Sequence, residues 1–133
     1  MTRPAAADAL DLAPHPEGGW YRRTWTSPVV VDTPYGPRPS ATAILYLFDA
    51  PGRWHRVRST ELWCRHSGPA ADLVLGGDGD GPVPGPVLRL APGSPQCEVP
   101  AGVWQRAVPD AGGPVLVSCL VSPGFDVADF ELR

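Results

Sequence analysis

The stretch RWHRVRSTELWCRH, residues 53–66, contains two runs with the residue alternation of β-strands, separated by a short polar turn. A period of two places His55 and Val57 on one face of the first run. The same period places Glu61 and Trp63 on one face of the second run. The two runs therefore predict a hairpin in which His55 and Glu61 meet across neighbouring strands.

Similar runs continue along the chain and indicate an all-β protein. Glycine and proline account for 15 and 18 of the 133 residues, which predicts many tight turns between strands. A hydrophobic content of 43% with 19% charged residues favours a packed core over disorder. We expect one domain over residues 1–133, folded as a jelly-roll β-barrel. Its expected strands are 20–26, 42–48, 53–58, 61–66, 71–75, 86–90, 96–99, 105–108, 115–121 and 128–132.

A short helix is expected near the N-terminus. Small and apolar residues in the segment 2–12 are spaced to pack one face of a helix, and Pro14 follows them. Two segments rich in glycine and proline, 34–39 and 76–85, are expected to be loops. The acidic residues of the second segment lack the ligand spacing of a calcium-binding loop. The last strand is expected at the edge of a sheet.

The charge and the cysteines limit the partners and the compartment. The net charge of −3 leaves no basic surface for nucleic acid. Three cysteines without CxxC spacing favour a reducing cytoplasm over a disulfide framework or a zinc site. No run approaches the roughly 20 apolar residues of a membrane span, and no apolar region of a signal peptide is visible. We expect a cytoplasmic protein without nucleic-acid or membrane partners.

Two short motifs resemble those of the cupin superfamily. The spacing from His55 through Glu61 to Gly68 follows the first cupin motif, and PAGVWQ at 100–105 resembles the second. In cupins these motifs supply three histidines and one glutamate that hold a metal inside a small β-barrel. Here Val57 and Gln105 stand at two of the histidine positions. The resemblance therefore implies no metal cofactor, or at most a weakly held divalent metal at His55, Glu61 and Gln105.

Longer motifs resemble one family within this superfamily, the DUF985 or cupin-5 family. They run in order along nearly the whole chain: LAPHPEGGWYRRTW (12–25), WHRV (54–57), ELW (61–63), VPAGVWQ (99–105), VSC (117–119) and SPGFDVADFEL (122–132). The resemblance implies a jelly-roll barrel, a homodimer and a likeness to sugar-nucleotide epimerases of the dTDP-dehydrorhamnose type. It implies a pocket for a small molecule and leaves the reaction open.

The residues themselves also favour a polar pocket with hydrophobic walls, which is the usual form of a small-molecule site. Glu61 beside His55 can hold the imidazole in one tautomer and raise its basicity. We therefore expect three catalytic residues: His55 as the base, Glu61 as its orienting group and Tyr21 as an acid. The residues expected to hold the substrate are Arg23, Tyr46, Trp63 and Gln105. A buried His–Glu pair can equally serve only the stability of the fold.

The favoured function is a metal-independent isomerase or epimerase, or a related lyase or cyclase. Such an enzyme moves a proton on a small polar metabolite, for which the resemblance suggests a sugar-nucleotide or secondary-metabolite intermediate. Two alternatives stay open at this point. One is a non-catalytic small-molecule binding protein with the same pocket, and the other is a metal-dependent cupin oxygenase. His15, which lies between two prolines, is expected to fix a turn.

Overall fold

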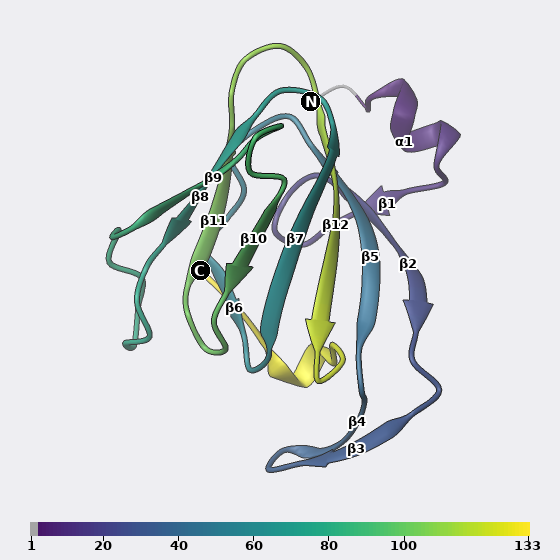
Figure 1. Cartoon of the computed structure of the whole chain (residues 1–133), viewed down its shortest axis with the longest axis vertical. Coiled ribbons are helices and arrows are strands. Elements are labelled where there is room, and N and C mark those ends of the chain that lie inside the picture. Colours follow the sequence, from purple (N-terminus) through teal and green to yellow (C-terminus); the bar gives the residue numbers. More distant parts are fainter. Residues whose placement is uncertain (1–2) are drawn as a thin grey trace.

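The structure, a computed structural model that describes residues 3–133, consists of two packed β-sheets and a short N-terminal helix (Figure 1). All strand pairs are antiparallel, as expected for a jelly roll. The elements are α1 (Ala5–Ala9), β1 (Ala13–Pro14), β2 (Trp20–Thr26), β3 (Val30–Thr33), β4 (Gly36–Pro39), β5 (Thr42–Phe48), β6 (His55–Val57), β7 (Thr60–Ser67), β8 (Ala71–Leu75), β9 (Val87–Leu90), β10 (Gln96–Val99), β11 (Gln105–Pro109), β12 (Val115–Ser122), the 3-10 turn η1 (Val127–Asp129) and β13 (Phe130–Leu132).

The strand order confirms the jelly-roll fold but not a closed barrel. Six strands form one sheet in the order β1-β2-β5-β12-β7-β10, and five form the other in the order β13-β6-β11-β8-β9. Within residues 3–133, no backbone ladder joins the two sheets. A cavity lies along the seam between β2 and β13, and residues of both strands line it. The two sheets therefore form a sandwich that is open at this seam.

The core lies between the two sheets, where the alternation of the strands buries one face. In β12 every second residue from Val115 to Val121 is buried, as the predicted alternation requires. In β7 the same pattern buries Glu61 and Trp63 and leaves His66 exposed. Tyr46 and Phe48 of β5 stack on each other and meet the Trp63 ring edge-on.

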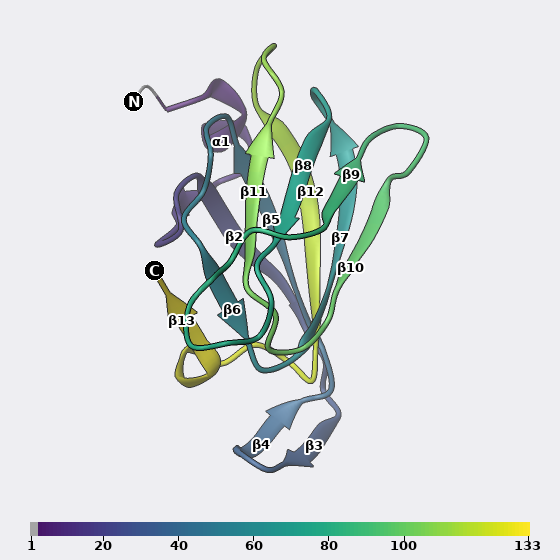
Figure 2. The ribbon, with the colours of Figure 1, turned by 90° about the vertical axis from the view of Figure 1, so that its left-hand side faces the viewer.

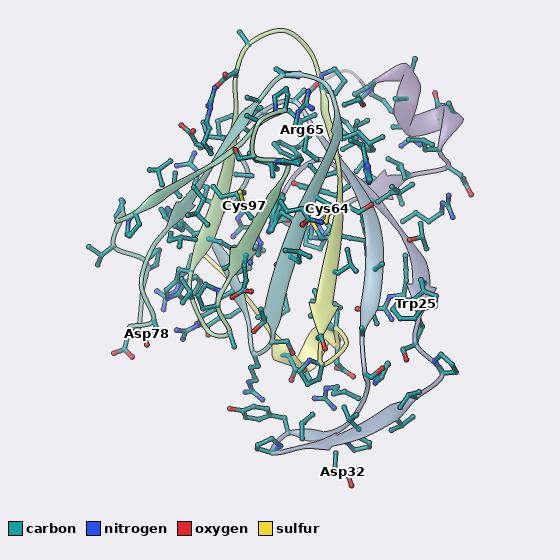
Figure 3. The ribbon with its side chains drawn as sticks, in the orientation of Figure 1. Trp25, Asp32, Cys64, Arg65, Asp78 and Cys97 are labelled. Carbon is teal, nitrogen blue, oxygen red and sulfur yellow. The ribbon has the colours of Figure 1, made fainter. Side chains whose placement is uncertain are left out.

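The N-terminal helix is shorter than the segment 2–12 expected from the sequence. α1 packs on the outer face of the six-stranded sheet, where Ala7 and Leu12 contact Trp20 and Leu47. The first residue of the expected segment lies outside the described residues. The three cysteines are free thiols; Figure 3 shows Cys64 on β7 and Cys97 on β10.

A projecting hairpin is the main departure from the expected loops. Residues 34–39, expected to be irregular, include β4, which pairs with β3 in a separate two-stranded sheet below the body (Figure 2). Figure 3 shows Asp32 on β3 of this hairpin, pointing away from the body. The Arg38 guanidinium donates two hydrogen bonds, of 2.8 and 2.9 Å, to the buried carboxylate of Asp129 in η1. That contact joins segments far apart in sequence, so no local pattern could predict it.

The other expected boundaries hold with small changes. The segment 76–85 contains no helix or strand. The last expected strand, 128–132, begins as η1 and becomes β13 only at Phe130. β13 lies at the edge of the five-stranded sheet, as expected.

The turn 15–19 between β1 and β2 is held by several backbone contacts. His15 N donates to the carbonyl oxygen of Gly19 (2.9 Å), and the Tyr46 hydroxyl donates to that of Gly18 (2.6 Å). Arg53 N donates to the carbonyl oxygen of Glu17 (2.8 Å) and so ties the turn to the segment before β6. Gly18 and Gly19 both have positive φ, of 103° and 80°, which favours glycine.

Replacing Gly19 with alanine is expected to lower the free energy of unfolding by about 2–4 kcal/mol. The added Cβ would lie 2.6 Å from the carbonyl oxygen of Leu47, at a left-handed φ. Gly18→Ala is the matched control, because its Cβ would meet nothing within 4 Å and only the backbone cost of about 1 kcal/mol remains. Urea unfolding of the two variants measures the difference. Equal losses in both would contradict this account of the turn.

Candidate active site

A cavity of about 360 Å³ opens at the seam between β2 and β13. Its walls come from both sheets, from the turn 15–19 and from the C-terminal segment that contains Phe125 and Phe130. The volume lies in the range of small-molecule sites. Ile44, Val57 and Val121 give the walls an apolar character, and the polar groups gather at a few points.

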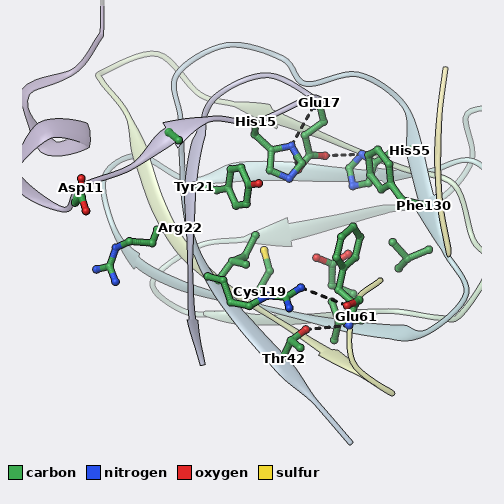
Figure 4. Close-up of a pocket in the computed structure, with 16 residues that line it drawn as sticks. Asp11, His15, Glu17, Tyr21, Arg22, Thr42, His55, Glu61, Cys119 and Phe130 are labelled. Atoms are coloured by element: carbon green, nitrogen blue, oxygen red, sulfur yellow. Dashed lines mark hydrogen bonds and ion pairs between the residues drawn. The ribbon is translucent and has the colours of Figure 1, made fainter. Parts of the chain in front are cut away.

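At one of these points a buried imidazole meets a buried carboxylate. His55 Nδ1 lies 2.6 Å from Glu17 Oε2, and the two residues are only 3% and 6% exposed. The same nitrogen lies 3.0 Å from the carbonyl oxygen of Arg53. Both neighbours are acceptors, so Nδ1 carries a hydrogen. Figure 4 shows the other ring nitrogen, Nε2, turned into the cavity, where it makes no hydrogen bond within residues 3–133.

The Glu17 carboxylate keeps the His55 imidazole protonated at neutral pH. Burial opposes the charged ring, but the charge and hydrogen bond of Glu17, with the charge of Glu61 and the Arg53 carbonyl, outweigh it and raise the pKa of His55 to about 9. The resting group is therefore an imidazolium paired with a carboxylate. In this form the His55 Nε2–H is a proton donor facing the cavity.

Glu61 reaches the cavity from the other side and is held by a chain of side chains. Trp63 Nε1 donates to Gln105 Oε1 (2.9 Å), which leaves the Gln105 amide nitrogen to donate to Glu61 Oε1 (2.6 Å). The Cys119 thiol also donates to Glu61. Burial raises the pKa of Glu61, against the opposing effects of the His55 charge and of these donors. Two donors aimed at one carboxyl group complement its ionised form.

His15 is a second imidazole at the same wall. Its Nδ1 accepts a hydrogen bond from the backbone N–H of Glu17 (3.0 Å) and lies 3.7 Å from Glu17 Oε1. Its ring packs edge-on against Tyr21 at 4.6 Å between centroids. Burial lowers the pKa of His15, and the charge of His55 adds to that effect while Glu17 opposes it. The two histidines on either side of Glu17 thus have pKa values shifted in opposite directions.

The structure brings four of the seven expected site residues to the cavity wall: Tyr21, Arg23, His55 and Glu61. The other three, Tyr46, Trp63 and Gln105, lie behind the wall in the core. Tyr46 supports the turn 15–19, and Trp63 and Gln105 hold Glu61 in place. The hydrogen bond to His55 that we expected from Glu61 is made by Glu17 instead.

The sequence predicts no chemistry for Glu17 and only a turn for His15. His15 does fix the turn, through its hydrogen bond with Glu17 N, and it also lines the cavity. The motif HPEGG at 15–19 could have indicated a role for His15 and Glu17 in the site, because it places two polar side chains on a turn fixed by proline and glycine.

The side chains at the cupin metal positions do not fit a catalytic metal. Val57 offers no donor atom, and both ends of the Gln105 amide are used by Trp63 and Glu61. His55 offers only its Nε2 atom as a ligand, because its Nδ1–H is held by Glu17. Residues 3–133 contain no group of three or more His, Cys, Asp or Glu side chains placed to hold a metal ion. A catalytic metal site usually needs three protein ligands, and the side chains at these positions do not supply them.

Comparisons with known proteins agree with the fold. The family model described as Cupin superfamily (DUF985) matches residues 5–133. A hypothetical protein from Leishmania major is 33% identical, with a TM-score of 0.82 over 94% of this chain and 83% of that one. A protein from Shewanella oneidensis is 29% identical, with a TM-score of 0.82 over 100% of this chain and 85% of that one.

A more distant structure, from Klebsiella pneumoniae, is described as having a double-stranded β-helix domain. It is 15% identical, with a TM-score of 0.65 over 100% of this chain and 98% of that one, and so supports the fold alone. No curated protein matches this chain. Among residues 3–133 there is no helix of the length and apolar character needed to cross a membrane.

The free energy of unfolding is expected to fall as the pH rises from 6.5 to about 9. The folded state holds the His55 proton more tightly than the unfolded chain, whose histidine has the ordinary pKa of 6.5. The stabilisation is therefore complete below pH 6.5 and is lost as the pH passes through about 9. Urea unfolding at a series of pH values measures the slope.

Glu17→Gln is the comparison variant for this measurement, because it removes the ion pair and leaves the other titrating groups in place. Its stability is expected to fall less over the same pH range. Parallel pH dependence in the two proteins would show that Glu17 does not set the pKa of His55.

Proposed function

The chain belongs to the DUF985 family of the cupin superfamily, and we propose that it is an enzyme that transfers protons on a small polar metabolite. The reaction class is that of an isomerase or a lyase. The observation that carries the proposal is the His55–Glu17 pair, whose free Nε2 faces a cavity of ligand size. A buried dyad of this kind combines a fixed ring orientation with a perturbed pKa, as acid–base catalysis requires.

His55 and Glu61 supply the two groups that such a reaction needs. Glu61, when ionised, removes a proton from a substrate carbon next to a carbonyl group, and its raised pKa makes it a stronger base than an exposed carboxylate. The electron pair of the broken C–H bond shifts toward the carbonyl, whose oxygen takes the proton of the His55 imidazolium. The product is an enol. Return of a proton to carbon completes an isomerisation, and loss of a leaving group completes an elimination.

The cavity mouth supports an anionic substrate. Arg23 donates to the carbonyl oxygen of Phe125 (3.3 Å) and lies over the Phe125 ring, and it forms no ion pair within residues 3–133. Most of its N–H groups are therefore available to a carboxylate or phosphate. Arg22, at the same mouth, donates to the carbonyl oxygen of Leu10. The suggested likeness to dTDP-sugar epimerases stays a prediction from the sequence.

Incubation of the protein in D2O with a panel of carboxylated and phosphorylated carbonyl compounds tests the proposal. Proton NMR is expected to show loss of the signal from the C–H next to the carbonyl of the substrate. In His55→Gln the exchange rate should fall by about a hundredfold or more, because the proton donor is missing. His66→Gln is the matched control, since His66 lies outside the cavity against Ser118.

Two results would contradict the enzyme assignment. Line broadening of a ligand without exchange would identify a binding protein. Exchange that stops after treatment with a chelator and returns with a transition metal would identify a metal-dependent reaction instead.

Arg23→Gln is expected to raise KM for the anionic substrate about tenfold and to leave kcat nearly unchanged. The exposed Arg23 side chain lines the cavity and makes no hydrogen bond or ion pair with His55 or Glu17. It is therefore expected to contribute to binding in the ground state and the transition state alike. Steady-state kinetics of the exchange reaction measure both constants. A large fall in kcat with an unchanged KM would place Arg23 at the reacting atoms instead.

A further inference from the structure

Glu17 holds two imidazole rings in different ways, through its side chain and through its backbone. The Glu17 carboxylate accepts a hydrogen bond from the Nδ1–H of His55. The Glu17 backbone N–H donates a hydrogen bond to Nδ1 of His15. A nitrogen that accepts a hydrogen bond from a backbone N–H carries no hydrogen itself. The hydrogen of neutral His15 is therefore on Nε2.

The surroundings of His15 fit a neutral ring. Tyr21, Tyr46 and Phe130 pack around it edge-on, at centroid distances of 4.6, 5.4 and 6.3 Å. The charged groups that face it are the Glu17 carboxylate, which favours protonation, and the His55 imidazolium, which opposes it. Burial adds to the effect of His55.

Both histidines present their Nε2 atoms to the same cavity. Figure 4 shows the two rings side by side on the wall formed by the turn 15–19 and β6, each with one nitrogen engaged at Glu17 and the other turned inward. In this geometry the two inward nitrogens are both N–H donors. Two fixed N–H donors aimed at one region are the arrangement that stabilises an oxygen as it gains negative charge.

We propose that His15 is a further catalytic residue, which forms with His55 a binding site for the substrate oxygen that becomes negatively charged. The inference rests on the proposed proton transfer and specifies its substrate class: a compound with a carbonyl group next to an acidic C–H. When Glu61 takes the carbon-bound proton, the electron pair moves to the carbonyl oxygen. The Nε2–H of His15 donates a hydrogen bond to that oxygen without giving up its proton, while His55 transfers its own.

The fold holds this site rigid before a ligand arrives. The backbone contacts of the turn 15–19 fix the position of His15, and the Tyr46 hydroxyl secures the turn from behind. A preformed donor pair is the form in which such hydrogen bonds contribute most to catalysis, because no reorganisation is needed during the reaction.

Binding of 4-nitrophenol tests the oxygen site without knowledge of the substrate. Its anion absorbs visible light and its neutral form does not, so absorbance at a pH below its own pKa reports how far the protein favours the oxyanion. The wild-type protein is expected to bind the anion and increase its fraction. His15→Asn should bind it about tenfold more weakly, because asparagine can accept the Glu17 N–H as an Asx turn does but places no donor in the cavity.

His66→Asn is the control with the same change of side chain outside the cavity, and it should bind the anion as the wild type does. Thermal melting within a few degrees of the wild type would establish that His15→Asn is folded. Equal binding of the anion by His15→Asn and the wild type, or no binding by the wild type, would overturn the proposal.

The tautomer of His15 gives a second readout that does not depend on ligand binding. In protein with 15N-labelled histidine, NMR at neutral pH is expected to show His15 with hydrogen on Nε2 and none on Nδ1. A doubly protonated ring or the Nδ1–H tautomer would overturn the assignment. Anion binding that depends on His15 in a protein without any deuterium exchange would instead contradict the proposed function and leave the oxygen site standing.

Discussion

The contact between the Glu17 carboxylate and the His55 imidazole constrains the rest of the site. A charged ring that is 3% exposed has lost its hydration, and only a close partner of opposite charge makes that burial tolerable. Glu17 provides this partner at 2.6 Å. The turn 15–19 must therefore enter the space between the sheets and be held there, which the Arg53 and Tyr46 contacts accomplish.

The open side of the jelly roll gives the site its access. If β2 and β13 were joined by a backbone ladder, the His55–Glu17 pair would be sealed in the core. Instead the seam between the sheets leaves a cavity with the acid–base groups inside and Arg23 at the mouth. The same seam places the His15 ring next to that of His55. The departure from a closed barrel and the presence of a candidate active site thus have one structural cause.

The fold could be predicted from the sequence because it depends on local patterns. Alternation placed Glu61 and Trp63 inward, and the substitutions Val57 and Gln105 at the cupin positions pointed to a weakened metal site. The partner of His55 could not be predicted in this way. Glu17 is distant in sequence, and it meets His55 only because the turn 15–19 folds back over the β6 end of the cavity.

The roles of the core residues were hidden for a related reason. Alternation shows which face of a strand is buried, but it does not separate residues that line a cavity from those packed behind its wall. Tyr46, Trp63 and Gln105 face inward as expected, yet they act on other side chains. The β3–β4 hairpin likewise depends on the long-range pair of Arg38 with Asp129. Contacts of this kind are set by the assembled tertiary structure.

Proton NMR of the Nδ1–H of His55 tests the central claim most directly. A hydrogen held between a ring nitrogen and a carboxylate oxygen 2.6 Å apart is expected to resonate far downfield. This signal is expected in the wild type and in Glu61→Gln, and it is expected to disappear in Glu17→Gln. A signal that survives in Glu17→Gln and is lost in Glu61→Gln would show that Glu61 holds His55 and would contradict the site described above.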